Sequence, residues 1–344
     1  MTDRPNDTLA ASPDTTLVPG LATGIGSLPH TDARTAVEVS LEGTPRLPAA
    51  PQLPNRNERE LMLPQWAVAL PEITVGPGGV LRFDPGVDLA PPEPRFDAMA
   101  HAGLLAFVEV LESRPNPVPR VKLQLTGPLT LGIALCGAGM TAPVAFRRAS
   151  EVVRAWIPML ETLIATRLPG TRVVLVLDEP GLVVWRESEG PIERESAVDM
   201  LSGALASVQG IAGVHMCGHG DRRLVLEAGP QLISMEVADD LVDDGGLIAR
   251  YLDGGGWVGW GAIPTDGPIG DSGDHLWRRL AAVWCELTRR GCDPVLLRTR
   301  AVITPACGLA GHGPSQAARA LRLASMLADR VHDQAFAARL TLGA

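Results

Sequence analysis

The chain has 344 residues, of which 46% are hydrophobic and 20% are charged. This is the composition of a globular protein, and the length suits one large α/β barrel or two ordinary domains. The net charge is −9 and Lys122 is the only lysine, which excludes nucleic acid as a partner because nucleic-acid binders concentrate basic residues. No apolar run approaches the roughly 20 residues of a membrane span, so we expect no contact with a membrane.

The cysteines and the N-terminal residues indicate the compartment. The five cysteines are odd in number and follow no regular spacing, a pattern typical of reduced thiols in a cytoplasmic protein. Residues 1–20 are rich in proline, threonine and acidic residues, and they lack the basic region and apolar stretch of a signal peptide. We therefore predict a flexible N-terminal tail over 1–20 and a single domain over 21–344.

The first quarter of the chain is predicted to be irregular. A short strand from Leu21 runs into a turn of glycine, serine and proline, and a helical pattern follows over 32–41. The proline-rich segment 45–54 has room only for a short extended piece near Pro51. The segment 71–95, rich in glycine and proline, predicts a surface excursion or a small hairpin.

From residue 96 the chain alternates between helices and short apolar strands. The expected helices cover 96–113, 142–167, 197–208, 222–228, 244–252, 274–290 and 314–340. The expected strands lie within 120–128, 172–180, 213–217, 232–237, 257–264 and 302–308. Such alternation predicts a parallel sheet covered by helices on both faces.

The number of strands favours a closed barrel. With the strand before Gly26 and the piece near Pro51, the count reaches eight, which predicts a (β/α)8 TIM barrel. A doubly wound open sheet is the alternative architecture. The absence of a GxGxxG turn after any strand disfavours it.

Four potential metal ligands stand where predicted strands end: His215, Cys217, Glu236 and Cys307. Alone, each is compatible with an ordinary strand-end residue. Because His215 and Cys217 are two residues apart, they share a face of a strand, and parallel barrels gather their chemistry at the carboxyl ends of strands. Imidazole and thiolate are preferred zinc ligands, so we predict a zinc site. Two thiolates and a carboxylate exceed the charge of zinc, which favours a nucleophilic zinc-bound thiolate over activation of water.

Asp178 and His312 are further candidates. Asp178, followed by a glutamate and a proline, either begins a helix, where acids are favourable, or faces the barrel mouth and binds a substrate ammonium group. His312 stands beside the start of the last helix, where it could assist an anion held by helix amides. His30 and His219 are interpreted as polar loop residues, and the remaining cysteines as packing or incidental thiols.

Taken together, these residues resemble the cobalamin-independent methionine synthase family, specifically its C-terminal catalytic barrel. The wider superfamily also contains uroporphyrinogen decarboxylase and coenzyme M methyltransferases. The matching segments, in chain order over roughly residues 20 to 330, are Ile25–Pro29, Leu125–Thr130, Leu177–Pro180, His215–Cys217, Glu236 and Pro305–Leu309. The resemblance implies a single catalytic (β/α)8 barrel, as in the short core forms of this enzyme.

The resemblance also implies roles for individual residues. It implies that the four strand-end ligands bind Zn²⁺ and that the sulfur of homocysteine adds to the metal as a thiolate. Ile25 and Ser27 would lie near the substrate carboxylate, and Asp178 and Glu60 near its ammonium group. The thiolate would attack a methyl group to give methionine, and metal coordination would keep the sulfur deprotonated without a general base.

Two departures from the family pattern concern the methyl donor. The aliphatic segment 131–135 stands where the family has an aromatic residue for stacking of a folate pterin. The family's Asp-x-His-Ser segment, whose histidine protonates the leaving pterin, appears here as 261–266 without a histidine. The resemblance therefore implies a methylcorrinoid, brought by a corrinoid carrier protein, in preference to methyltetrahydrofolate.

Three other functions remain open at this point. A coenzyme M type thiol alkyltransferase would need cationic residues near the mouth for a sulfonate. An enzyme similar to uroporphyrinogen decarboxylase would need no metal. A non-catalytic zinc-binding protein would hold the ion without transferring any alkyl group.

Overall fold

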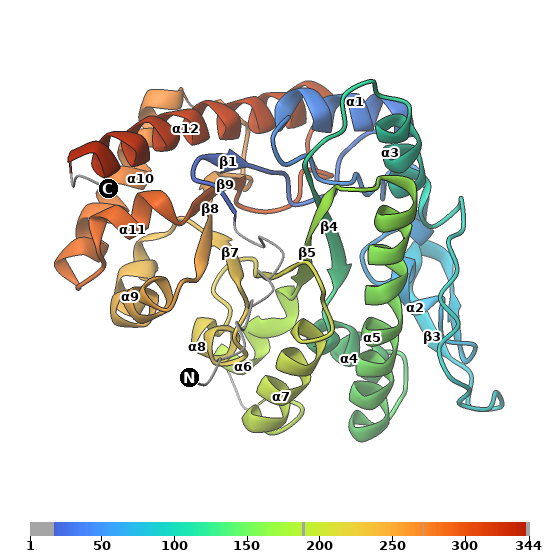
Figure 1. Cartoon of the computed structure of the whole chain (residues 1–344). Helices are drawn as coiled ribbons and strands as arrows, with labels where there is room; N and C mark the ends of the chain where they lie inside the picture. The colour runs from blue at the N-terminus through green and yellow to red at the C-terminus, as the bar shows by residue number, and fades with distance from the viewer. Residues whose placement is uncertain (1–16, 188–189, 271, 342–344) are drawn as a thin grey trace, which may run out of the picture.

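The computed structural model describes residues 17–187, 190–270 and 272–341. A curled sheet of seven strands lies at the centre, with helices packed around it (Figure 1). The strands run in the order β1-β9-β8-β7-β6-β5-β4, and every neighbouring pair is parallel. Their bounds are β1 Leu21–Ala22, β4 Arg120–Thr126, β5 Arg172–Asp178, β6 Ile211–His215, β7 Leu232–Glu236, β8 Trp257–Ile263 and β9 Ala301–Pro305. The arrangement confirms the α/β prediction and is consistent with a TIM-like barrel.

The predicted eighth strand near Pro51 is an irregular segment within the described residues. It is linked to the two edges of the sheet by isolated bridges, Ala49 to Lys122 of β4 and Gln52 to Ser27 beyond β1. The backbone of Gln52 donates to Gly26 and accepts from the residue after Ser27, at 3.0 and 2.9 Å. Proline removes ladder donors, so this proline-rich stretch pairs only locally.

Helices surround the sheet on its outer side (Figure 1). They are α1 Ala33–Gly43, α2 Pro64–Ala67, α3 Ala102–Glu112, α4 Pro128–Gly137, α5 Ala142–Arg167, α6 Val183–Glu187, α7 Arg194–Leu205, α8 Arg222–Glu227, α9 Gly245–Asp253, α10 Gly273–Arg289, α11 Pro294–Thr299 and α12 Pro314–Thr341. None of the described helices combines the length and apolar character that crossing a bilayer requires. The segment 71–95 contains a small antiparallel hairpin of β2 Ile73–Val75 and β3 Leu81–Phe83.

Two apolar cores hold the fold together. The larger lies between the sheet and the helices, and contains Leu123, Leu175 and Trp260 with the buried faces of α5 and α10. The smaller lies on the inner face of the sheet, where Val176 and Leu232 meet Leu17. Because side chains alternate along a strand, the same inner faces end in Asp178, His215 and Ser234 at the carboxyl ends. The inner core therefore forms the floor under the polar groups.

Differences from the expected elements have local causes. The helix expected from residue 96 begins only at Ala102, because the amides of Ala100 and His101 form a turn on the carbonyl of Asp97. Helices α4 and α11 are short and were not expected, and each begins with a proline at its first position. Residues 1–16 of the predicted tail lie outside the described residues, while Leu17 is 3% exposed and belongs to the inner core.

Candidate metal and thiol site

A cavity of about 270 Å³ opens at the carboxyl ends of the strands. Its polar or reactive lining residues are Ser27, Gln52, Asp178, His215, Cys217 and Cys307. Its apolar lining includes Ile25, Pro54, Leu61 and Met62. A larger groove of about 630 Å³ runs along the outer face of α5, but no histidine or cysteine lines it. The chemistry predicted from the sequence therefore converges on the smaller cavity.

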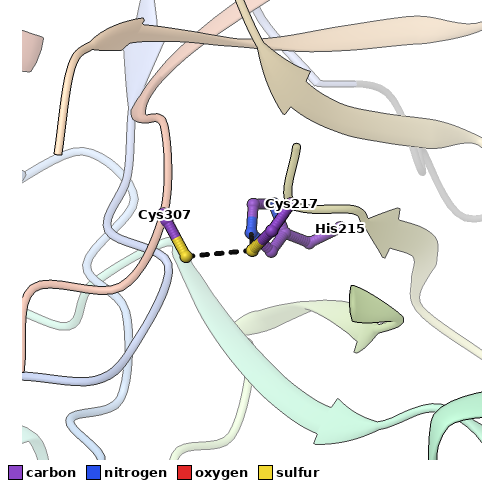
Figure 2. A group of neighbouring side chains, drawn as sticks. All are labelled: His215, Cys217 and Cys307. Atoms are coloured by element: carbon purple, nitrogen blue, oxygen red, sulfur yellow. Dashed lines mark hydrogen bonds between the residues drawn. The ribbon is translucent and has the colours of Figure 1, made fainter. Parts of the chain in front are cut away.

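Three of the four predicted metal ligands meet in this cavity (Figure 2). The Sγ atoms of Cys217 and Cys307 lie 2.9 Å apart, and Nε2 of His215 lies 3.2 Å from Sγ of Cys217. The three ligand atoms all lie within 4.8 Å of one another. One imidazole and two thiols at this spacing are a suitable donor set for zinc.

The loops that carry the two thiols are shaped by glycines. After Cys217 the chain turns at Gly218, whose φ of 58° is in the left-handed region that glycine adopts without strain. After Cys307, Gly308 packs so closely on Ser27 that a Cβ there would lie 2.0 Å from the serine Oγ. The loop after β9 therefore touches the turn after β1, and this contact brings Cys307 over the cavity.

The imidazole of His215 is oriented by the neighbouring strand. His215 is 2% exposed, and its register partner on β7 is Ser234. Nδ1 of the ring lies 3.0 Å from the Oγ of Ser234. When Nδ1–H donates to this hydroxyl, the lone pair of Nε2 is left to face the thiols, which is the arrangement of a histidine that ligates metal through Nε2.

The two thiols share one proton unequally. A hydrogen bond from Cys217, with a further contribution from His215, lowers the pKa of Cys307 well below that of a free thiol. The same hydrogen bond, together with burial, raises the pKa of Cys217. Of the two, Cys307 is therefore the thiol that more readily becomes a thiolate, which is the form that binds metal.

The predicted fourth ligand, Glu236, stands outside this trio of side chains. Glu236 ends β7 two residues beyond Ser234, and its register partner is Gly261 on β8. Its charge contributes to raising the pKa of Cys217, so the carboxylate acts on the thiols electrostatically. The structure thus brings three of the four predicted ligands together and leaves Glu236 at a greater distance.

Asp178 lies in the cavity wall, and its neighbour Glu179 has a different role. Asp178 is 7% exposed, and its Oδ1 atom has no hydrogen-bond partner among the described residues. Burial raises the pKa of Asp178, while the charges of Lys122 and His215 oppose the shift. Glu179 is fully buried and accepts hydrogen bonds from the amides of Leu129 and Thr130 at the start of α4. Glu179 therefore stabilises the start of the earlier helix α4 and makes no side-chain cap on the helical turn that follows it, and Asp178 remains available to a ligand.

Ile25 and Ser27 line the cavity as predicted, but Glu60 does not. Glu60 is fully buried, and its Oε1 accepts a hydrogen bond of 3.0 Å from the amide of Gly103 at the start of α3. Its Oε2 forms an ion pair of 3.3 Å with Arg56. Burial raises the pKa of Glu60, against these stabilising contacts. The carboxylate of Glu60 is thus bound by Gly103 and Arg56 and does not line the cavity.

His312 and His219 flank the cavity without lining it. Nε2 of His312 lies 3.2 Å from the carbonyl oxygen of Thr265, in the segment after β8, and Nδ1 lies 3.4 Å from Gln316. His219 pairs with Asp240 at 2.9 Å and is largely exposed, as a polar loop residue would be. His312, which the sequence predicted to assist an anion, thus lies beside the amino end of α12 and next to Gly311, which lines the cavity.

Sequence reasoning missed two residues of the site, Lys122 and Ser234. Both lie on inner strand faces and are almost fully buried. A signal was present in β4, where Lys122 alternates with apolar residues and is followed by Gln124 and Thr126 on the same face. Strict alternation in a strand that is buried on both faces indicates a polar inner face, because wholly apolar runs are the rule in parallel sheets.

Comparison with known proteins identifies similar folds but no family. No protein-family model matches the sequence, and no curated protein matches it. Among solved structures, a protein from Listeria monocytogenes that carries the assignment of vitamin-B12 independent methionine synthase aligns with a TM-score of 0.57 and 14% identity, over 88% of this chain and 86% of that chain. A methyltransferase from Methanosarcina mazei aligns with a TM-score of 0.54 and 15% identity, over 93% of this chain and 94% of that chain. At this identity the likeness shows a shared fold.

Proposed function

We propose that this chain is a zinc-dependent methyltransferase that methylates the thiol of homocysteine to give methionine. The observation that carries the proposal is the meeting of one imidazole and two thiols beside an unpartnered, buried carboxylate in one cavity. The names of the two structural neighbours, a methionine synthase and a methyltransferase, support the same reaction class.

The residues present fit a zinc ion. His215, Cys217 and Cys307 supply three of the nitrogen and sulfur ligands that zinc prefers, and Ser234 supports the imidazole from behind. Glu236, at the end of the adjacent strand, is the proposed fourth ligand. When bound, the metal supplies the positive charge that keeps a substrate sulfur deprotonated at neutral pH.

The remaining lining residues would bind and orient the amino acid. The free Oδ1 of Asp178 would accept the substrate ammonium group, and the turn from Ile25 to Ser27 would receive its carboxylate. Leu61 and Met62 contribute apolar surface to the cavity wall, which suits the methylene groups of the acceptor. A substrate held at both charged ends directs its thiol to the trio of ligands.

The charge of the cavity favours an amino-acid thiol over a sulfonate thiol. Among the described residues, its lining includes Asp178 and no lysine or arginine. A sulfonate would meet this buried carboxylate with no cation in the lining, since Lys122 lies behind the wall on the Ile25 carbonyl, whereas an ammonium group would be paired by the carboxylate. The coenzyme M type reaction is therefore the less favoured alternative.

The surroundings of the cavity favour a methylcorrinoid donor. The segment 131–135, where the resembling family has an aromatic residue, lies within α4, and its Leu131 and Leu135 are fully buried. Neither residue lines the cavity, so this segment provides no stacking surface for a pterin. We propose a corrinoid carrier protein as partner, with His312 assisting an anionic group at the amino end of α12.

A donor screen tests the proposed function. Protein of measured zinc content is incubated with homocysteine and either methylcobalamin or methyltetrahydrofolate, and methionine is quantified. Zinc near one equivalent and methionine from methylcobalamin are expected. Zinc binding without methyl transfer from either donor would favour the non-catalytic zinc protein, and a zinc-free preparation that decarboxylates a tetrapyrrole would favour the decarboxylase.

A further inference from the structure

The only lysine of the chain, Lys122, lies inside the barrel under the candidate site. It sits on the inner face of β4 and is 2% exposed. Burial of an ammonium group is unfavourable unless other groups compensate its charge and hydrogen bonds. The other 29 residues in the lysine and arginine total are arginines. The only lysine ammonium group of the chain therefore lies at this interior position.

The hydrogen bonds of Lys122 lead to the wall of the cavity. Its Nζ donates to the carbonyl oxygen of Ile25, which lines the cavity. A second, longer contact of 3.4 Å joins Nζ to the side-chain oxygen of Gln124. Through the first bond, a charged donor on β4 holds the turn that follows β1, across the irregular part of the barrel.

Gln124 supports the same turn from the same strand face. The side chain of Gln124 packs directly under Gly26, where φ is 139° and an added Cβ would lie 2.4 Å from the carboxamide carbon. Its Nε2 donates to the carbonyl of Ala50 at 2.8 Å. Lys122 and Gln124 thus bind the turn around Ile25 and the segment around Ala50, which lie where regular strand pairing is missing between β4 and β1.

The turn that they hold has free donors. Within the described residues, neither the amide nor the hydroxyl of Ser27 donates a hydrogen bond, although its carbonyl accepts one of 2.9 Å from Leu309. Ser27 lines the cavity, so these two donors are available to an acceptor placed there. A carboxylate is an acceptor-only group that suits such a pair.

Charge also links Lys122 to Asp178 on the neighbouring strand β5. Burial lowers the pKa of Lys122 to about 8, and the carboxylate of Asp178 raises it, so the ammonium group stays protonated at pH 7. Lys122 is thereby the buried cation between the carboxylate that would meet a substrate ammonium and the turn that would meet a substrate carboxylate.

We propose that Lys122 is a positioning residue of the acceptor pocket: through the Ile25 carbonyl it fixes the turn from Ile25 to Ser27, so that this turn forms the subsite for the carboxylate of a substrate thiol. This inference rests on the proposed function for the identity of the substrate. The statement that Lys122 fixes the turn does not depend on the proposed function.

Binding of three thiols to the zinc-loaded protein tests the subsite by calorimetry. The probes are homocysteine, 4-mercaptobutyrate, which lacks the amine, and 3-aminopropanethiol, which lacks the carboxylate. Lys122→Met is one atom shorter, keeps the unbranched shape of the side chain and removes its charge and donors. It is expected to weaken binding of the two carboxylates roughly tenfold or more and not to weaken binding of 3-aminopropanethiol, because the removed cation acts on Asp178. Equal effects on all three probes would overturn the subsite.

Hydrogen exchange on the same zinc-loaded proteins tests the holding of the turn without any substrate. The amides of 21–28 are expected to exchange faster in Lys122→Met than in the wild type. Leu123→Met, on the same strand but facing the helices, is the matched control and should exchange like the wild type. Unchanged exchange in Lys122→Met would overturn the role of Lys122. If the wild type binds no thiol, the proposed function falls, and exchange still decides on Lys122.

If Lys122→Met does not fold, NMR spectroscopy of wild-type protein labelled with ¹⁵N-lysine tests the hydrogen bond from Lys122 to Ile25. The chain has one lysine, so a single side-chain signal is possible. A buried, hydrogen-bonded ammonium group exchanges its protons slowly with water, and one ¹H–¹⁵N ammonium correlation is expected at neutral pH. Rapid exchange that removes this signal would contradict the bond to Ile25.

Discussion

Nδ1 of His215 lies 3.0 Å from Oγ of Ser234, its register partner on the next strand. The contact joins a metal-ligand candidate to a residue that does not itself face the thiols. It fixes the orientation of the ring, and in the tautomer whose Nδ1–H donates to the hydroxyl, Nε2 is left for a metal. The first prediction follows from this pair.

Ser234→Ala is expected to weaken zinc binding roughly 10- to 100-fold, because the imidazole loses the contact that orients it. The affinity is measured by competition with a chromophoric chelator. Ser234→Thr retains the hydroxyl and serves as the control, with an affinity near that of the wild type. An alanine variant that binds zinc as tightly as the wild type would show that the hydroxyl has no orienting role.

Cys307→Ser is expected to lose most of its zinc and its methyl-transfer activity, because one of two thiolates is removed from the donor set. The loss of affinity should exceed the roughly 10- to 100-fold change expected for a supporting contact. Metal content after dialysis against a chelator is the measurement. Cys285→Ser, at an exposed position on α10, is the matched control and should retain both zinc and activity. Retention of both by Cys307→Ser would refute the proposed ligand set.

Asp178→Asn is expected to raise KM for homocysteine roughly tenfold or more, because the substrate ammonium group loses its charged partner. Methyl transfer to 4-mercaptobutyrate, which has no amine, should change little. Steady-state kinetics with the two acceptors make the comparison within one variant. A similar loss with both acceptors would mean that Asp178 acts on the site in general and does not recognise the amine.

Glu179 is expected to make the protein less stable as the pH rises from about 4.5 to about 7. Burial raises the pKa of Glu179 to about 7 in the folded protein, above the ordinary 4.5. The folded state then binds a proton that the unfolded state releases, so the free energy of unfolding falls across this window, by on the order of 3 kcal/mol. Denaturant unfolding of the wild type and Glu179→Gln at several pH values measures it. A glutamine variant with the wild-type pH slope would contradict the prediction.

The inner faces of single strands were predictable from the sequence, and the stagger between strands was not. The spacing of His215 and Cys217 places both on one face, and apolar runs mark the strand ends where the thiols stand. The stagger that pairs His215 with Ser234, two residues before Glu236, depends on the shear of the whole barrel. No pattern within β7 contains that information, and the assignment of Glu236 as the fourth ligand stays a prediction.

Long-range contacts limited the rest of the prediction. Glu60 precedes an apolar run and looked available, but its carboxylate stabilises the start of α3 through the amide of Gly103. That contact joins residues 43 positions apart and leaves no local signature. The two acids after β5 were ambiguous for the same reason, because the amides that bind Glu179 come from a helix 49 and 50 residues earlier.

The irregular segment around Ala49 and Gln52 gives the molecule a seam. Regular pairing joins β4 through β9 and β9 to β1, whereas between β4 and β1 two isolated bridges and the side chains of Lys122 and Gln124 make the connection. Local opening should begin there, because few ladder bonds oppose it. Such an opening would move the turn from Ile25 to Ser27, which stays with β1 and β9, away from Asp178, which stays paired with His215 on β6. The two ends of an amino-acid acceptor could then be released separately while the strands that carry the imidazole and both thiols stayed paired.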